Sequence, residues 1–135
     1  TRFDGVDYDQ TSEYIRIHSS TYIDKILENH GWTKGNRDDS NIIEPIHPQA
    51  VKELETTNGP EKNSPSSTAL EAKMGFNYRQ CIGEVIYAFV TTRPDIGTAV
   101  ATLAKFSDQP AMCHYVALKR LYRYLRQTKD FGVVY

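Results

Sequence analysis

The chain has 135 residues, of which 39% are hydrophobic and 24% are charged, and its formal net charge is -1. This length fits one domain at most, and no apolar run approaches the roughly 18 residues of a membrane span. The N-terminus has no secretory signal pattern, so we expect a cytoplasmic protein without a membrane partner. The two cysteines, Cys81 and Cys113, are too few for a disulfide framework and lack the spacing of a metal site.

Charge is unevenly distributed along the chain. Residues 1–75 hold eight Lys or Arg against 13 Asp or Glu, a balance of -5, whereas residues 76–135 hold eight against four, a balance of +4. A polyanion is therefore expected to bind the later part of the chain. Because the sequence starts at Thr1 and stops at Tyr135 inside an apolar, strand-like run, we also expect a part of a longer protein.

Residues 1–33 are predicted to form a β-hairpin followed by a helix. Alternating residues at 3–8 and the β-formers at 14–17 flank a polar turn, which is the pattern of a hairpin. Hydroxyl side chains at 19–21 can cap the helix that follows, and Gly31 is expected to end it. The residues of this helix that recur at helical spacing are Tyr22, Ile23, Ile26, Leu27 and His30.

Residues 34–75 are predicted to be a polar, proline-containing loop that is partly disordered. Four prolines interrupt a stretch rich in Ser, Asn, Glu and Asp. Such a composition buries too little apolar surface to offset the entropy lost on ordering. Only 50–55 is expected to form a helical turn.

Residues 76–130 are predicted to form three helices with short connectors. Asn77 is expected to cap the first and Pro94 to start the second, while the last is expected to open at 108–109 and end near Thr128. The apolar stripe of the first helix comprises Tyr78, Cys81, Ile82, Val85, Ile86 and Phe89. That of the second comprises Ile96, Ala99, Val100, Leu103 and Phe106.

The fold class expected from these elements is an α+β fragment that is mostly α. It consists of an N-terminal β-hairpin, a long irregular loop, a small helical bundle and a short C-terminal strand. Residues 131–135 supply that strand, because β-formers follow Gly132 there.

The last helix carries a basic face of one sign. At about 100° per residue, His114, Leu118, Leu121 and Leu125 share one side, flanked by Tyr122 and Tyr124. Four basic side chains lie away from that side: Lys119, Arg120, Arg123 and Arg126. An exposed helix usually mixes charge signs, so this pattern indicates phosphate contacts with a nucleic acid. The alternative is that these residues only solvate the face and complement the helix dipole.

No complete active site is recognisable in the sequence. Asp38 and Asp39 form the only adjacent aspartate pair, but they lie in the polar loop without the hairpin of a polymerase metal site. Cys81 falls on an apolar helix face and is expected to be an inert thiol. A metal site is not expected from the histidines, which are scattered along the sequence at His18, His30, His47 and His114.

The ordered motifs of the chain resemble one family. From Tyr78 the sequence reads YRQCIGEVIYAFVTTRPDIGTAVATLAKFSDQP, and then HYVALKRLYRYLRQTKDFGVVY from His114. This series resembles the part of copia-type retrotransposon reverse transcriptases between the polymerase palm and the ribonuclease H domain. The resemblance covers nearly the whole chain. The matching positions are Phe3, Gly5, 22–27, Tyr78, Arg79, Gly83, Tyr87, 92–96, 104–106, Pro110, His114, 123–125, Thr128, Gly132 and Tyr135.

The resemblance implies a non-catalytic segment of an RNA-directed DNA polymerase. In that family the first hairpin is the primer grip, which implies primer-grip-like roles for Phe3 and Gly5, although Asp4 stands where the family usually has leucine. The helices form the thumb, which holds the template–primer duplex and implies phosphate binding by Lys119, Arg120, Arg123 and Arg126. No cofactor is expected in this chain, and Mg²⁺ is implied for the parent polymerase only.

The same resemblance divides the chain and names its partners. Residues 1–33 would hold the primer-grip-like hairpin and first thumb helix, 34–75 the loop, 76–130 the thumb-like bundle, and 131–135 the start of the connection to ribonuclease H. The expected partners are an RNA–DNA or DNA duplex and the palm and ribonuclease H domains of the polyprotein. The location would be the cytoplasm, including a virus-like particle. The alternative for the basic face is packing on one of those domains.

Two other interpretations remain open. The chain could be a stand-alone helical DNA-binding module, although recognition helices read bases from an N-terminal turn. Here that turn begins at Ala111-Met112-Cys113, with no base-reading side chain. It could also be an inactive remnant or a protein-interaction bundle.

Overall fold

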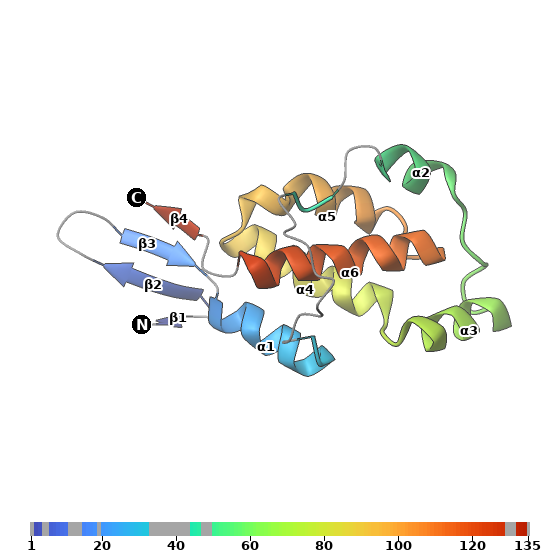
Figure 1. Cartoon of the computed structure of the whole chain (residues 1–135), viewed down its shortest axis with the longest axis horizontal. Helices are drawn as coiled ribbons and strands as arrows, with labels where there is room; N and C mark the ends of the chain where they lie inside the picture. Colours follow the sequence, from blue (N-terminus) through green and yellow to red (C-terminus); the bar gives the residue numbers. More distant parts are fainter. Residues whose placement is uncertain are drawn as a thin grey trace.

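The computed structural model describes the backbone of residues 2–3, 6–10, 15–18, 20–32, 44–46, 50–128 and 132–134, and the side chains of 21–32, 44–46 and 50–128. The helices of these segments are α1 (Ser20–His30), α2 (Ala50–Thr56), α3 (Pro65–Met74), α4 (Tyr78–Thr91), α5 (Gly97–Ala104) and α6 (Met112–Gln127), with a 3-10 turn η1 (Pro94–Ile96) before α5 (Figure 1). The strands are β1 (Arg2–Phe3), β2 (Val6–Gln10), β3 (Ile15–His18) and β4 (Gly132–Val134). They neighbour one another in the order β1-β2-β3-β4, and each adjacent pair is antiparallel.

The packed body of the chain is all-α, which corrects the predicted α+β class. Between residues 20 and 128, the described segments contain six α-helices and one 3-10 turn but no strand. Within the residues whose side chains are described, the buried hydrophobic core runs from Ile23 to Leu125, and helices supply its packing. The expected N-terminal hairpin and C-terminal strand lie outside this helical body in sequence.

The prediction of a long irregular loop at 34–75 is wrong for much of its length, because α2 and α3 lie within it. The expected helical turn at 50–55 is confirmed as α2, whereas α3 was not expected. The Ser64 hydroxyl caps α3 by accepting the N–H of Ser67 at 3.2 Å, and Gly75 ends it at a φ of 84°. No residue of α3 is buried, so apolar periodicity does not mark it.

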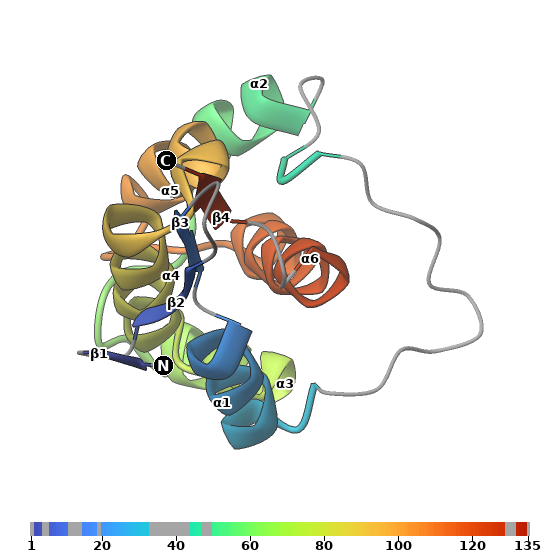
Figure 2. The same ribbon diagram turned by 90° about the vertical axis from the view of Figure 1, so that its left-hand side faces the viewer.

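Helix α6 is the central element of the body. Figure 2 looks nearly along α6 and shows α1, α4 and α5 gathered around one side of it. Its buried residues are His114, Tyr115, Leu118, Leu121, Tyr122, Tyr124 and Leu125. These include every apolar or flanking position expected for this helix, so the predicted helical phase is confirmed.

The buried stripe of α4 differs from the prediction at two positions. Ile86 and Phe89 are 40% and 37% exposed, whereas Ala88 is fully buried. Helix α4 contacts α1, α5 and α6, and the small Ala88 side chain lies on the covered side. The apolar stripe predicted for α4 is therefore too wide. Apolar spacing identifies the residue types that can be buried, but it does not show which of them the neighbouring helices cover.

Two predicted helix ends are confirmed. The Asn77 side chain accepts the N–H of Gln80 at 2.8 Å and so caps α4. Gly31, at a φ of 73°, follows the last residue of α1, and the N–H of Trp32 donates to the carbonyl of Leu27 at 2.8 Å. This backbone turn brings Trp32 back onto the helical body, where it packs against the core.

His114 sets the start of α6, which lies later than the predicted 108–109. Its Nδ1 accepts a hydrogen bond from the N–H of Ala111 at 2.8 Å, so the ring proton is on Nε2. Nε2 then donates to the carbonyl of Leu54, also at 2.8 Å, which attaches α2 to α6. The fully buried ring stacks on Phe106 at 4.0 Å between centroids.

Arg93, in the connector between α4 and η1, has no exposed surface. Its Nε and Nη2 donate to the two oxygens of Asp95 at 3.0 and 2.8 Å. Its Nη1 and Nη2 also donate to the carbonyl and hydroxyl of Thr128, at 2.9 and 2.7 Å. The Tyr124 hydroxyl donates to the same Asp95 carboxylate at 2.6 Å. The connector is thereby tied to the C-terminal end of α6.

This network lowers the pKa of Asp95. Partial burial alone would raise that pKa, but hydrogen bonds from Arg93 and Tyr124 and the charge of Arg93 outweigh burial and hold it below its usual range. Because the folded-state pKa is below the unfolded one of about 3.9, Asp95 stabilises the fold fully above about pH 4. That contribution is lost as the pH falls through the folded-state pKa.

We predict that Asp95→Asn lowers the free energy of unfolding at pH 7 by about 2 kcal/mol, because it leaves the buried Arg93 without a counter-charge. This is less than for a fully buried pair because the Asp95 side chain is 34% exposed. The difference from wild type should shrink as the pH falls below about 4, because Asp95 in the unfolded chain, whose pKa is higher, takes up a proton first. Urea unfolding at pH 7 and pH 3 measures this, with Asp108→Asn as the control because that carboxylate is 70% exposed. An equal loss at both pH values would contradict it.

Gly59 lies against the backbone that leads into α6. A Cβ added there would overlap the carbonyl of Gln109 and the backbone of Pro110, whereas a Cβ at Gly83 in α4 meets nothing within 4 Å. The segment after α2 can therefore approach the start of α6 only with glycine at this position.

We predict opposite effects of alanine at these two glycines. Gly59→Ala should lower the free energy of unfolding by about 1–3 kcal/mol, because rigid backbone atoms must move. Gly83→Ala should raise it by up to about 1 kcal/mol, as alanine does within helices. Thermal unfolding of the two variants measures both effects, and a neutral Gly59→Ala would show that the approach is not tight.

Candidate functional site

The four basic residues of α6 lie on the side of the helix away from its buried face. Lys119 is exposed, and Arg120, Arg123 and Arg126 are partly buried. Among the described residues, no carboxylate forms an ion pair with Lys119 or Arg120. Within the part of the chain that the structure describes, the positive charge of these two residues is therefore not neutralised.

Two of these basic residues contact Trp32, which follows α1. The Lys119 ammonium lies 5.6 Å from the centre of the Trp32 ring, within the range of a cation–π interaction. The Arg126 guanidinium donates to the Trp32 carbonyl at 3.3 Å. Part of the basic face thus holds α1 against α6, a role that helical periodicity alone does not indicate.

Arg120 presents a different environment. Its Nε is shielded from solvent and has no hydrogen-bond partner among the described residues. Burial of an unsatisfied N–H is unfavourable. Because this nitrogen is shielded, an anion would have to contact Arg120 through the other atoms of its guanidinium group.

Several other sequence candidates cannot be placed. Only the backbone of Phe3 is described, in β1, and Gly5 lies outside the described residues. Asp38, Asp39 and His47 also lie outside them.

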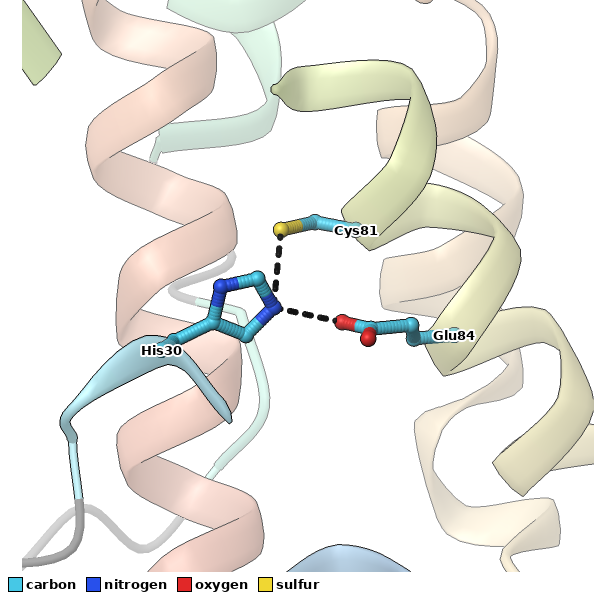
Figure 3. Close-up of side chains that lie close together, drawn as sticks. All are labelled: His30, Cys81 and Glu84. Atoms are coloured by element: carbon cyan, nitrogen blue, oxygen red, sulfur yellow. Dashed lines mark hydrogen bonds and ion pairs between the residues drawn. The ribbon is translucent and has the colours of Figure 1, made fainter. Parts of the chain in front are cut away.

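A second cluster, not expected from the sequence, joins α1 to α4 (Figure 3). His30 Nε2 lies 2.7 Å from Glu84 Oε1 and 3.6 Å from Cys81 Sγ. The three ligand-type atoms lie within 4.8 Å of one another. The Cys81 side chain is fully buried, while those of His30 and Glu84 are 13% and 16% exposed.

Tyrosines and a tryptophan hold this cluster in place. The Tyr122 hydroxyl donates to Glu84 Oε1, and the Tyr22 hydroxyl donates to the Glu84 carbonyl at 3.2 Å. Trp32 stacks on the His30 ring at 4.6 Å. Burial, with the Glu84 charge adding to it, raises the pKa of Tyr22 to about 12. Burial also raises the pKa of Tyr122, so both tyrosines stay neutral hydrogen-bond donors.

The Cys81 thiol is protonated at neutral pH. Burial is the main cause, and the Glu84 charge adds to it, whereas a hydrogen bond with Tyr122 acts in the other direction; together they raise the pKa of Cys81 to about 12. The expected position of Cys81 on the apolar face of its helix is confirmed, since the residue is buried. The expectation that the histidines have no metal-ligating neighbours is wrong for His30. Cys81 and Glu84 lie next to it in space, although they are 51 and 54 positions away in sequence. One signal was present, since Cys81 and Glu84 are three residues apart on one helix face.

Comparisons with known proteins point to mobile elements. "Retrovirus-related Pol polyprotein from transposon TNT 1-94" of Nicotiana tabacum is 28% identical over 121 residues, which are 89% of this chain and 8% of that polyprotein. "Retrovirus-related Pol polyprotein from transposon RE1" of Arabidopsis thaliana is 43% identical over 56 residues, which are 42% of this chain and 4% of that polyprotein. The chain is homologous to a segment of retrotransposon Pol polyproteins. At that level, the resemblance found in the sequence is confirmed.

A relative with a different name also matches. "Secreted RxLR effector protein 161" of Plasmopara viticola is 41% identical over 56 residues, which are 42% of this chain and 39% of the effector. The chain thus spans well under half the length of each of these three relatives. No protein-family model matches the chain. No solved structure matches it significantly.

None of the helices in the part of the chain that the structure describes combines the length and apolarity needed to cross a bilayer.

Proposed function

We propose that this chain is a non-catalytic thumb and connection segment of an RNA-directed DNA polymerase, and that it holds the template–primer duplex. The observation that carries the proposal is the division of α6 into two faces. One face is buried in the core, and the other presents Lys119, Arg120, Arg123 and Arg126. Homology to retrotransposon Pol polyproteins supports a setting in which nucleic acid is the substrate.

The mode of binding follows from the side chains. Lysine and arginine on one helix face contact phosphates without reading bases, which suits a segment that must accept any sequence. Arg120, which is partly exposed, would contact a phosphate oxygen through the exposed part of its guanidinium group. Mg²⁺ and the carboxylates that bind it would belong to other parts of the polyprotein, in the cytoplasm or a virus-like particle.

The parts of the chain take their roles from this proposal. Residues 1–33 would contribute a primer-grip-like element that includes Phe3 and Gly5, and 76–130 the thumb-like bundle. Residues 131–135 would begin the connection to ribonuclease H. Within 34–75, α2 and α3 would brace the bundle, since Leu54 is buried and its carbonyl binds His114.

A stand-alone DNA-binding module is less well supported. His114, in the first turn of α6, is fully buried, so this turn offers no base-reading side chain at that position. A nuclease footprint on one defined DNA site would favour that module over the duplex-holding segment.

We predict that Lys119→Gln, Arg120→Gln and Arg123→Gln together weaken binding to an RNA–DNA hybrid. Three lost phosphate contacts should flatten the slope of log affinity against log salt by roughly 2 to 3 units, at about 0.9 per contact. Arg126 is kept because its guanidinium holds the Trp32 carbonyl. Fluorescence anisotropy of the chain with a labelled hybrid, over a series of salt concentrations, measures the effect.

The matched control is Lys52→Gln, Lys73→Gln and Arg79→Gln, which removes the same charge from exposed positions outside α6. This control should keep most of the affinity and the salt slope. Equal losses in both triple variants would mean that binding follows net charge, which contradicts a dedicated face on α6. Failure of the wild-type chain to bind the hybrid at low salt would contradict the proposal itself.

A further inference from the structure

We propose that His30, Cys81 and Glu84 form a binding site for a zinc ion that links α1 to α4. The cluster joins two helices that are separated by about fifty residues of sequence. None of its three ligand-type residues belongs to the basic face of α6. The proposal stands independently of nucleic-acid binding.

The donor atoms select the class of metal. An imidazole nitrogen, a thiol sulfur and a carboxylate oxygen are the three kinds of ligand that Zn²⁺ accepts in proteins. Magnesium and calcium prefer sites made of oxygen atoms alone, and the sulfur of Cys81 makes this site unsuitable for them.

The two distances from His30 Nε2 are close to those of a tetrahedral site, and the three donor atoms lie within 4.8 Å of one another. Zinc bonds of about 2.0 to 2.3 Å keep neighbouring ligand atoms roughly 3.3 to 3.7 Å apart. The distance of 3.6 Å between His30 Nε2 and Cys81 Sγ fits this without change. The distance of 2.7 Å between Nε2 and Glu84 Oε1 must open by less than about 1 Å. The partly exposed Glu84 side chain can make that movement by rotating about its side-chain bonds.

The three donor atoms converge on one point. In the absence of a metal, His30 Nε2 donates to Glu84 Oε1 and lies beside the Cys81 sulfur. With a metal between the three atoms, each would direct a lone pair at the ion.

Binding would exchange protons for the metal. The thiol of Cys81 loses its proton to solvent as the Zn–S bond forms, and the neutral His30 ring keeps one proton, on Nδ1, so that Nε2 can bind. The carboxylate of Glu84 supplies the third bond. The fourth position is left to water, which reaches the site on the side where His30 and Glu84 are partly exposed.

The surrounding residues suit a metal site. The Tyr122 hydroxyl donates to Glu84, as partners of ligating carboxylates do, and Trp32 covers one face of the His30 ring. A bound zinc would fix the C-terminal end of α1 on α4 and would stabilise the contact between the two.

Cobalt titration of the full chain tests the site. Co²⁺, which takes the place of Zn²⁺, should give the charge-transfer absorption of a cobalt–thiolate bond, and an excess of Zn²⁺ should abolish it. Cys81→Ser should lose this band and weaken Co²⁺ binding at least ~100-fold, beyond the effect typical of changes outside the ligand set. Cys113→Ser, which alters the partly buried cysteine of α6, should keep both. Tyr122→Phe should weaken binding about 10-fold.

A melting experiment covers the case in which Cys81→Ser does not fold. Zn²⁺ should raise the melting temperature of the wild-type chain and of Cys113→Ser, because it binds only the folded state. Glu84→Gln should lose most of that rise. The proposal would be overturned if wild type gave no thiolate band with Co²⁺, or if the band followed Cys113 rather than Cys81. A melting shift that Glu84→Gln retains in full would also overturn it.

Discussion

The arrangement of the helical body depends on one guanidinium group that has no contact with solvent. Arg93 belongs to a connector, yet its donors reach Asp95 beside it and Thr128 at the end of α6. A buried cation is tolerated only when its donors are satisfied, so the connector and the last turn of α6 must meet in one register. This register places α5 and α6 together, and the packing of the apolar side chains between them follows from it.

Features that depend on local sequence patterns could be predicted, whereas features that depend on contacts between distant residues could not. Helix α6 was predicted in phase because its leucines and tyrosines recur at helical spacing and all face one core. Helix α3 was missed because it buries none of its residues, so only its caps mark it. The attachment of α2 to α6 was not predicted because the bond from His114 to Leu54 joins residues 60 positions apart. Pairings of that kind leave no local pattern, which is also why the His30 cluster was not expected.

Helix α6 combines two roles on one surface. Its apolar side organises the core, while Lys119 and Arg126 on the other side contact Trp32 and Arg120 retains an unsatisfied nitrogen. The basic face is therefore not uniform: one part of it stabilises the attachment of α1, and for the other part we propose phosphate binding. Sequence periodicity predicts the face but cannot separate these parts, because the difference depends on where Trp32 lies.

The position of Trp32 has a practical consequence for spectroscopy. It is the single tryptophan of the chain, and its ring touches the rings of His30, Phe76 and Tyr122, which come from three different parts of the fold. Indole emission depends on its surroundings, so fluorescence excited at this residue reports on one known junction without any added dye. The chain thus carries its own optical reporter at the place where α1, α4 and α6 meet.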